Sequence, residues 1–466
     1  MELYTKKDEE LLEQKIEPIL DKLNELKKST KREMDDKDIE NAINVILKFI
    51  KDNKRKIYGG YAMNFLIKQK NPEDAFYKKS TDVCPYDPLP DIDFYSDDPI
   101  KDIVALCNLL QDNGFENIKG SEALHRETYN IFIDKKIFSQ ISYVPKNIYH
   151  KLQFINIDGI YFIHPIMFKI DFLRMMSDPL LSYWRIAKQF KRFILVDKYY
   201  PFTHINKSLK TNQPDESIKL ALDVVLKFVE NRSTIIVLGY YAFNHYLYKV
   251  TNKTINVPNY DIISTEFKSD SEELIKKLKD AYPNDITFEE YYPFFQLYGY
   301  SVRIYYKKNL IATIYHYNKI CVPFLQLHSN YIDSIQKVNV ATFSLLLGFT
   351  LQRSVYARVN DDTDLKDVCL TMASNLIDLR HDYFNRTNTT IYDDTLFKDF
   401  VINCIGEPAD LEKERQLLIE ERKKLKKKYT FSYIPAQDRD KPMESYVFLN
   451  TSGNKVNNEK NLKLTL

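Results

Sequence analysis

The sequence predicts an α/β fold of the α+β type, in which one domain with a mixed β-sheet and flanking helices occurs twice in tandem. Two observations predict it. Three blocks of sequence recur in the same order in the second half of the chain. In both halves, apolar residues at helical spacing alternate with short runs at strand spacing, which is typical of sheets covered by helices. Further helical segments are expected at both ends.

The recurring blocks define the two copies. The pairs are VILKF at 45–49 and VVLKF at 224–228, GGYAMN at 59–64 and GYYAFN at 239–244, and PDIDFYS at 90–96 and PNYDIIS at 258–264. From their order and spacing we predict N-terminal helices and a first domain over 1–205. A second, degenerate domain is expected over 206–400, followed by a basic helix and a polar tail over 401–466.

Local signals predict each element of the first copy. Helices are expected where apolar residues fall on one face, and hairpins where alternating runs flank a polar turn. In chain order the expected elements are a helical stretch over 6–28 broken at Pro18, a helix over 37–51, a strand into a glycine turn at 57–60, a helix over 61–69, a loop over 71–88, a strand at 91–95, a helix over 99–113, hairpins turning at 134–136 and 158–159, and a helical stretch over 165–194.

The second copy is expected to repeat this order, with a hairpin over 301–315 and a helical region over 335–385. A charged helix over 411–428 ends in the basic run Arg422–Lys428. A solvated helix end and an RNA contact are the two interpretations of that run. From Pro435 onward the chain has few core residues, so we expect an extended tail.

Composition limits the class of protein. The 466 residues suggest two or three domains, and 44% hydrophobic residues suffice for sizeable cores. The net charge is only +2, so any nucleic-acid site must be a local basic patch. Five scattered cysteines without a C-x-x-C pair argue against a disulfide framework or a zinc cluster. Without a signal-peptide core or a long apolar run, we expect a soluble protein of a reducing compartment that spans no membrane.

Asp91 and Asp93 form the strongest candidate site. They flank Ile92 in a predicted strand, so both carboxylates project from one face while Ile92 enters the core. Two neighbouring carboxylates repel each other unless a cation lies between them. Oxygen ligands of this kind suit Mg²⁺, and two such ions can activate a hydroxyl and stabilise leaving pyrophosphate. An isolated D-x-D is more often an exposed strand end.

A glycine pair about thirty residues earlier strengthens the metal interpretation. Gly59 and Gly60 follow a short strand and precede a helix that begins near Tyr61 and contains Asn64. Glycines at such a turn let the backbone approach a phosphate, and the helix N-terminus offers free N–H groups. The chain has only 10 glycines, so an adjacent pair is informative.

The second copy has lost part of this pattern. Tyr240 stands where the first copy has Gly60, which places a ring at the point of close backbone approach. Asn259 stands where the first copy has Asp91, and an amide keeps the shape but not the charge that holds a divalent ion. We therefore expect catalysis in the first copy and a structural or RNA-holding role for the second.

Aromatic and basic residues alternate in the helical stretch over 165–194. Its cations are Lys169, Arg174, Arg185, Lys188, Lys191 and Arg192, interleaved with Phe172, Trp184, Phe190 and Phe193. An ordinary amphipathic helix with a solvated basic face and a surface that faces phosphate or RNA are equally consistent with this pattern.

A glycine turn, a helix and then D-x-D on a strand resembles the nucleotidyltransferase superfamily, with its DNA polymerase β-like fold. Duplication with a decayed second copy resembles the poly(A) polymerase catalytic subunits of large cytoplasmic DNA viruses, of the poxvirus and giant-virus kind. The segment Phe168–Ser177, with Trp184, Lys188 and Arg192 behind it, is similar to a basic helical segment of that family. The motif-level resemblance covers about residues 40–265.

This resemblance implies a polynucleotide adenylyltransferase. Gly59 and Gly60 would hold ATP, with Tyr61 and Asn64 beside them, and Asp91 and Asp93 would be catalytic ligands of two Mg²⁺ or Mn²⁺ ions. Lys188 or Arg192 would pair with triphosphate oxygens. The reaction would be attack of an mRNA 3′-hydroxyl on the α-phosphate of ATP, releasing pyrophosphate.

The family also uses a third acid on a neighbouring strand, and here the sequence departs from it. The best-placed residue is Gln140. Three interpretations stay open: Gln140 is a neutral ligand, Asp134 or Asp158 substitutes, or the predicted register is wrong.

Two other functions compete with mRNA polyadenylation. One is nucleotidyl transfer to a tRNA end, a small molecule or a nucleotide, and the other is a non-catalytic RNA-binding scaffold. The resemblance further implies a homodimer or a viral processivity subunit as partner. It places the protein in the host cytoplasm, in the viral factory, and in the virion.

Overall fold

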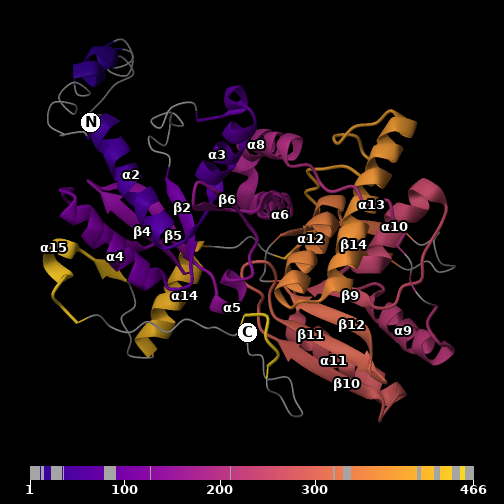
Figure 1. Cartoon of the computed structure of the whole chain (residues 1–466). Coiled ribbons are helices and arrows are strands. Elements are labelled where there is room, and N and C mark those ends of the chain that lie inside the picture. Colours follow the sequence, from indigo (N-terminus) through magenta and orange to yellow (C-terminus); the bar gives the residue numbers. More distant parts are fainter. Residues whose placement is uncertain are drawn as a thin grey trace, which may run out of the picture.

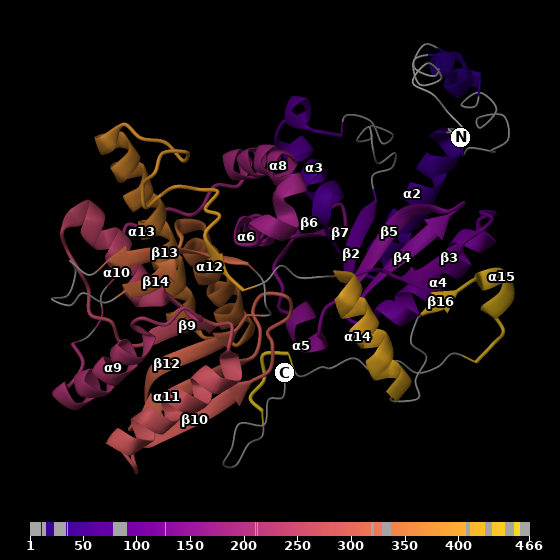
Figure 2. The same cartoon turned by 180° about the vertical axis from the view of Figure 1, so that it is seen from behind.

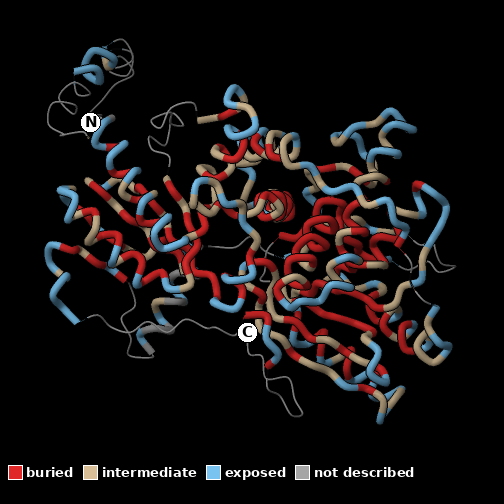
Figure 3. Tube along the Cα trace, viewed as in Figure 1, coloured by how far each residue is buried: buried red, intermediate tan, exposed pale blue. Residues whose placement is uncertain are grey.

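The computed structural model describes residues 11, 15–22, 34, 36–77, 91–125, 127–209, 211, 213–317, 321–328, 337–406, 411–424, 431–442 and 452–456. Within them, two eight-stranded sheets lie side by side, each flanked by helices (Figure 1). Buried residues gather in the sheets and in the helices between them (Figure 3). The architecture therefore has two lobes, one for each sheet.

The first sheet has the strand order β16-β3-β4-β5-β2-β1-β7-β6. Its strands are β1 (Lys56–Tyr58), β2 (Ile92–Ser96), β3 (Lys119–Glu122), β4 (Thr128–Ile133), β5 (Lys136–Tyr143), β6 (Phe154–Ile157), β7 (Ile160–Ile163) and β16 (Ser432–Tyr433). β2 runs antiparallel to β1 and parallel to β5, so the sheet is mixed, as predicted.

Helices of the first lobe cover this sheet. They are α2 (Asp36–Asp52), α3 (Gly59–Lys70), η1 (Pro72–Asp74), α4 (Pro99–Asp112), α5 (Lys146–Tyr149), α6 (Pro165–Met176), α7 (Pro179–Ser182), η2 (Tyr183–Arg185) and α8 (Ile186–Tyr199). α4 begins with the side chain of Asp98 accepting from the Lys101 amide and with Pro99 in its first turn, a common helix start. The predicted helices over 37–51 and 99–113 are confirmed.

The second sheet has the order β10-β11-β12-β9-β8-β14-β13-β15. Its strands are β8 (Ile235–Leu238), β9 (Tyr260–Ser264), β10 (Ile286–Tyr291), β11 (Ser301–Tyr306), β12 (Asn309–His316), β13 (Val322–His328), β14 (Lys337–Ala341) and β15 (Cys404–Ile405). Its helices are α9 (Glu216–Val229), α10 (Gly239–Thr251), α11 (Phe267–Ala281), α12 (Phe343–Val359) and α13 (Thr363–Thr387).

The two lobes share one topology. Without β16 and β15, the order β3-β4-β5-β2-β1-β7-β6 matches β10-β11-β12-β9-β8-β14-β13 strand for strand. The residue register matches too, because Asp93 lies opposite Tyr58 just as Asp261 lies opposite Leu238. The predicted duplicated α/β fold is confirmed.

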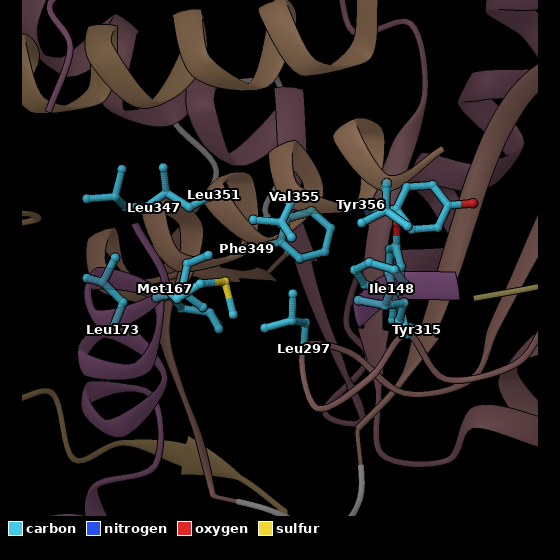
Figure 4. Close-up of a cluster of buried hydrophobic side chains, with 14 of the residues drawn as sticks. Ile148, Met167, Leu173, Leu297, Tyr315, Leu347, Phe349, Leu351, Val355 and Tyr356 are labelled. Carbon is cyan, nitrogen blue, oxygen red and sulfur yellow. The ribbon is translucent and has the colours of Figure 1, made fainter. Parts of the chain in front are cut away.

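Helices α6 and α12 join the lobes. They pack closely, and a Cβ built on Gly348 of α12 would lie 3.1 Å from the Cβ of Leu173 on α6. Figure 4 shows Leu173 opposite Leu347 and Leu351, and Ile148 of the first lobe beside Tyr315 and Tyr356 of the second. One apolar core therefore continues across the junction.

Two helical predictions need correction. The stretch over 165–194 is not one helix, because it breaks between α6 and α7, where Pro179 follows Ser177 and Asp178. The region over 335–385 begins with strand β14, whose residues Val338 and Val340 are buried and β-branched. The second error arose because a short apolar run does not distinguish a buried strand from a helix.

The tail that we expected to be extended from Pro435 onward packs on the fold within residues 435–442 and 452–456, and the segment just before it adds a strand. β16 adds a strand to the edge of the first sheet by pairing with β3, and α15 (Pro435–Asp438) follows it. Phe431 and Tyr433 are buried, and Tyr433 donates a hydrogen bond to Asn108 of α4 at 2.8 Å. Ser452 then contacts both lobes, accepting from Asn147 and donating to Pro293.

We expect Phe431→Leu to destabilise the protein by about 1 kcal/mol, since a buried ring is replaced by a smaller side chain. Phe431 is 4% exposed and its ring lies edge-on to Tyr129, 5.6 Å between centroids. Urea unfolding would measure the change, with Tyr392→Leu at a 70% exposed position as control. Equal stability of Phe431→Leu and wild type would show that this segment is not part of the fold.

The cysteine prediction is wrong for one pair. Cys321 and Cys404 form a disulfide, with Cα atoms 5.2 Å apart, that ties β15 to β13. Their separation of 83 residues left no local signal. Cys107 and Cys369 are buried free thiols, whereas Cys84 lies outside the described residues, as do 78–90 of the predicted loop and Leu425–Lys428 of the basic run. In the part of the chain that the structure describes, no helix has the length and apolarity to span a membrane.

Candidate active site

A tight turn links β1 to α3. Gly59 has φ +73°, and a Cβ built on it would overlap the Asp93 carboxylate. The N-cap residue Tyr58 makes no side-chain hydrogen bond to the first turn of α3, so the helix N-terminus is not capped from within. Free backbone N–H groups and the helix dipole suit this turn to an anion such as phosphate.

Gly59→Ala should lower both stability and activity. An L-residue at φ +73° costs about 1–2 kcal/mol, and the new methyl would displace the Asp93 carboxylate. Gly60→Ala is the matched control, because its Cβ would meet only the ends of the Arg192 and Tyr77 side chains at 3.1 and 3.2 Å. Thermal unfolding and nucleotide-addition rates should therefore fall more for Gly59→Ala. Equal effects would contradict the assigned geometry.

Asp91 and Asp93 lie where the sequence predicts them. Asp91 directly precedes β2 and Asp93 is its second residue, while Ile92 and Phe94 are fully buried on the other face. Across the sheet, Asp93 lies opposite Tyr58 on β1 and Gln140 on β5.

Two tyrosines border the carboxylates and were not predicted from the sequence. The ring of Tyr58 stacks on Tyr95 with 4.1 Å between centroids. The Tyr58 hydroxyl shares a 2.8 Å hydrogen bond with Ser142. Burial, and then the Asp93 charge, hold the pKa of Tyr58 well above its usual value. Burial likewise holds the pKa of Tyr95 well above its usual value. Both hydroxyls therefore stay neutral, and the stacked rings of Tyr58 and Tyr95 lie beside the two carboxylates.

The structure reduces the number of candidates for the third acid. The predicted register is correct, because Gln140 pairs with Asp93 in the sheet. Asp134 and Asp158 are turn residues with positive φ at the ends of hairpins, and Asp134 accepts from Asn117 at 2.7 Å. Six residues of strand separate Asp134 from Gln140, roughly 20 Å, so Asp134 is not a ligand. Asp158 lies in the turn just before β7. Because β7 runs parallel to β1, this turn is next to the start of β1, at the opposite end of that strand from Gly59.

The donor set fits a hard divalent cation. Two carboxylates and an amide converge on one face of the sheet, and oxygen donors of this kind bind Mg²⁺ or Mn²⁺. The Gln140 amide nitrogen donates to Asn130 at 3.0 Å, which leaves the amide oxygen as the ligating end. Among the described residues no group of three His, Cys, Asp or Glu side chains converges.

Arg192 reaches the glycine turn from α8. Its guanidinium donates to the Tyr77 hydroxyl at 2.7 Å and lies 4.4 Å from the centroid of Phe76. The structure therefore brings Arg192 to Gly60, whereas Lys188 is exposed one helical turn away. Tyr77 is a residue that sequence reasoning missed, since no pattern marked it.

Asn64 and Tyr61 have structural contacts. The Asn64 amide donates to the Tyr77 carbonyl at 3.1 Å and accepts from the Tyr77 amide at 2.8 Å. Asn244 holds Ile255 in the same way in the second copy. Asn64 thus positions the segment that carries Tyr77, which in turn holds Arg192. Tyr61 packs against Phe65, with 6.4 Å between ring centroids.

Asp171 on α6 is a further acid near the tyrosine pair. Its side chain is 48% exposed and accepts from Arg174 at 3.3 Å. Partial enclosure raises the pKa of Asp171, and Arg174 opposes the rise. Its charge acts on Tyr95 more strongly than that of Asp93 does. It lay within the Phe168–Ser177 segment, but spacing gave no reason to single it out.

The corresponding site of the second copy is closed. Asp261 is fully buried, and Arg353 of α12 donates to it at 2.6 Å. Burial raises the pKa of Asp261, while Arg353 opposes the rise. Tyr240 stands in the place of Gly60, and burial raises its pKa to about 12. The charges of Arg353 and Asp261 act on this tyrosine as well. A guanidinium therefore balances the charge that a metal ion would balance in the first copy.

Comparisons with known proteins agree with this geometry. Residues 44–182 match the family model "Poly(A) polymerase catalytic subunit", and residues 195–466 match "APMV, Putative poly(A) polymerase, catalytic subunit, C-terminal". The "Putative poly(A) polymerase catalytic subunit" of Acanthamoeba polyphaga mimivirus is 29% identical over 451 residues, 88% of this chain and 76% of the relative.

Two further relatives are similar. A protein of the same name from African swine fever virus (isolate Pig/Kenya/KEN-50/1950) is 28% identical over 179 residues, 37% of this chain and 35% of the relative. The crystal structure of the Megavirus polyadenylate synthase superposes with a TM-score of 0.82 at 31% identity, covering 99% of this chain and 94% of that one. The chain belongs to the poly(A) polymerase catalytic subunits of large DNA viruses, and it is a nucleotidyltransferase.

Proposed function

We propose that this enzyme adds AMP from ATP to mRNA 3′ ends without a template, at the first of its two sites. The observation that carries the proposal is the contrast between copies. Asp91 and Asp93 lie beside an open glycine turn, whereas Arg353 and Tyr240 fill the equivalent space. Of the two sites, only the first has both carboxylates and the glycine whose place Tyr240 takes in the second copy.

The residues of the first site have separate roles. Asp91 and Asp93 would hold two Mg²⁺ or Mn²⁺ ions, which would supply the charge that activates a 3′-hydroxyl and neutralises leaving pyrophosphate. The amides at Gly59 and Gly60 bind the phosphates of ATP. Gln140 orients or ligates, because a neutral amide does not take up a proton near neutral pH. Catalysis thus rests on positioning and charge neutralisation.

Arg192→Gln should raise the KM for ATP about tenfold or more, because a charge-assisted hydrogen bond to phosphate contributes roughly 1.5–3 kcal/mol. Lys188, one turn away, adds positive charge to the same phosphates. The matched control is Lys101→Gln, an exposed residue on α4. Steady-state kinetics with varied ATP would test it, and an unchanged KM would remove Arg192 from the nucleotide site.

The decisive experiment is extension of a labelled RNA by the purified full chain. Each of the four nucleoside triphosphates would be offered separately, with Mg²⁺ or with Mn²⁺. Long tails with ATP alone support the proposal. Transfer only to a tRNA end, a nucleotide or a small molecule would favour a different acceptor, and no transfer at all would favour an RNA-binding scaffold.

We also propose that processive synthesis depends on a partner, either a second copy of the chain or a separate viral processivity subunit. The support is that its relatives are named catalytic subunits. Light scattering of the purified chain, alone and with RNA, would detect a dimer. We place the enzyme in the cytoplasmic viral factory and the virion because its relatives belong to large DNA viruses, and fractionation of infected cells would test this.

A further inference from the structure

An exposed aromatic surface leads away from the candidate active site. Trp184 is the chain's single tryptophan, and it is 68% exposed in η2, directly before α8. Its neighbour Tyr183 is 72% exposed. Large aromatic side chains left in water at one place mark a binding surface more often than chance exposure.

Unpaired cations surround these aromatic residues. Arg185 lies over the Trp184 ring, 4.5 Å from its centroid, and its Nε is buried without a hydrogen-bond partner among the described residues. Burial lowers the pKa of Arg185, as expected for a cation without a counter-charge. Lys188 and Lys191 are exposed and form no ion pair with any described carboxylate, whereas Lys198 at the other end of α8 pairs with Asp74 at 2.6 Å.

This surface is continuous with the nucleotide site. Lys188 and Arg192 lie four residues apart on one side of α8, and Trp184 lies four residues before Lys188, in η2. Arg192 contacts the glycine turn, and Trp184 is eight residues away, about 12 Å along the helix. Figure 2 shows α8 beside α3 and α6, on the side of the first sheet that faces the second lobe.

The equivalent surface of the second lobe differs. α13 packs on α12 and α10 as α8 packs on α6 and α3. Its cation Arg380 pairs with Asp399 at 2.7 Å, and acidic residues are interspersed along it. Unpaired positive charge next to exposed aromatic rings is therefore a property of the first lobe, where the chemistry is proposed to occur.

We propose that Tyr183, Trp184, Arg185 and Lys191 form a platform for single-stranded RNA just upstream of the 3′ end. The two rings stack on bases, and Arg185 and Lys191 neutralise the phosphates between them. Stacking is tolerant of sequence, and cations supply the affinity for a polyanion. A protein partner would not need unpaired cations, so RNA is the occupant that the charge favours. The platform rests on the proposed function only in that the RNA 3′ end lies at Asp91 and Asp93.

The single tryptophan gives a direct test. Titrating the full-length protein with oligo(A) RNA should quench Trp184 fluorescence in a saturable way that weakens with added salt. Trp184→Ala should weaken RNA binding about tenfold in an anisotropy assay with labelled RNA, and Arg185→Gln should do so several-fold, with the KM for ATP unchanged. Tyr392→Ala is the matched control: Tyr392 is 70% exposed, but it stacks on Phe400, in a segment where Lys398 pairs with Asp394.

The outcomes separate this inference from the proposed function. RNA that binds without quenching Trp184, or a Trp184→Ala protein with wild-type RNA affinity, would overturn the platform even if tails are synthesised normally. Quenching by ATP without RNA would overturn it as well, by assigning the ring to the nucleotide. If RNA quenches Trp184 but no nucleotide is added, the platform stands and the proposed polymerase activity fails.

Discussion

Asp91→Asn and Asp93→Asn should each lower the rate of AMP addition by more than about 100-fold. Residues that merely support a metal ligand typically contribute 10- to 100-fold to metal affinity or activity, so loss of a ligating carboxylate exceeds that range. With two acids and a neutral Gln140 in the set, no other acid among the described residues converges on the site to compensate. The double variant should be inactive at any tested concentration of Mg²⁺ or Mn²⁺.

The second copy supplies the control for folding. Asn259 already occupies the position of Asp91 in a strand with the same register, so Asp91→Asn is a change that this fold tolerates. Thermal unfolding of Asp91→Asn without added metal should match that of the wild type. RNA extension assays would then report chemistry alone. An Asp91→Asn enzyme that extends RNA at the wild-type rate would mean that the active site lies elsewhere.

The sequence predicted those features that local spacing determines. Residues i and i+2 of a strand share a face, so Asp91, Asp93 and the buried Ile92 followed directly from alternation. Gly59 was predictable because a glycine between a short strand and a helix marks a turn that demands a positive φ. Gln140 was singled out only through the family resemblance with its register left open, and the structure supplies the register that pairs it with Asp93.

Features made by distant segments were not predictable. Arg353 meets Asp261 across 92 residues, and Arg192 meets Tyr77 across 115. β16 pairs with β3 although more than 300 residues separate them, and it lies just before Pro435, where we expected the tail to begin. None of these contacts leaves a periodic signal, because each depends on how whole elements pack.

Comparing the two copies distinguishes residues that maintain the fold from residues that serve the reaction better than motif matching does. Gly59 and Asn64 have identical counterparts in Gly239 and Asn244, and both pairs make the same structural contacts. Gly60 and Asp91 differ from Tyr240 and Asn259. A residue that makes the same contacts in the closed copy holds the turn and its following segment. Asp93 is also kept, as Asp261, but Asp261 pairs with Arg353 of α12, so its retention does not make Asp93 structural. By this criterion Asn64 acts through position rather than by binding ATP.

The second large effect is expected from Arg353→Met, which should destabilise the protein by about 3–5 kcal/mol. The side chain of Asp261 has no exposed area, and Arg353 is its ion-pair partner at 2.6 Å. Removing one member of a buried ion pair leaves an uncompensated charge, which typically costs this much. Urea unfolding monitored by circular dichroism would measure the loss, and an unchanged free energy of unfolding would show that Asp261 does not need the guanidinium.

The pH dependence of this loss identifies its cause. Burial already raises the pKa of Asp261, and without Arg353 only the weaker effects of Arg303 and of the Tyr315 hydroxyl oppose the rise. A carboxyl whose pKa is higher in the folded state than in the unfolded state favours folding below the unfolded value, and that benefit is lost as pH rises through the folded value. Arg353→Met should therefore be least destabilised near pH 4 and increasingly so toward pH 7.

A second substitution distinguishes lost charge balance from lost packing. Adding Asp261→Asn to Arg353→Met removes the unpaired carboxylate and should restore part of the lost stability and flatten its pH dependence. Below its unfolding temperature, the double variant should still add AMP at the wild-type rate, because the proposed metal ligands lie in the other copy. A double variant that is stable but inactive would instead show that the closed site takes part in the reaction.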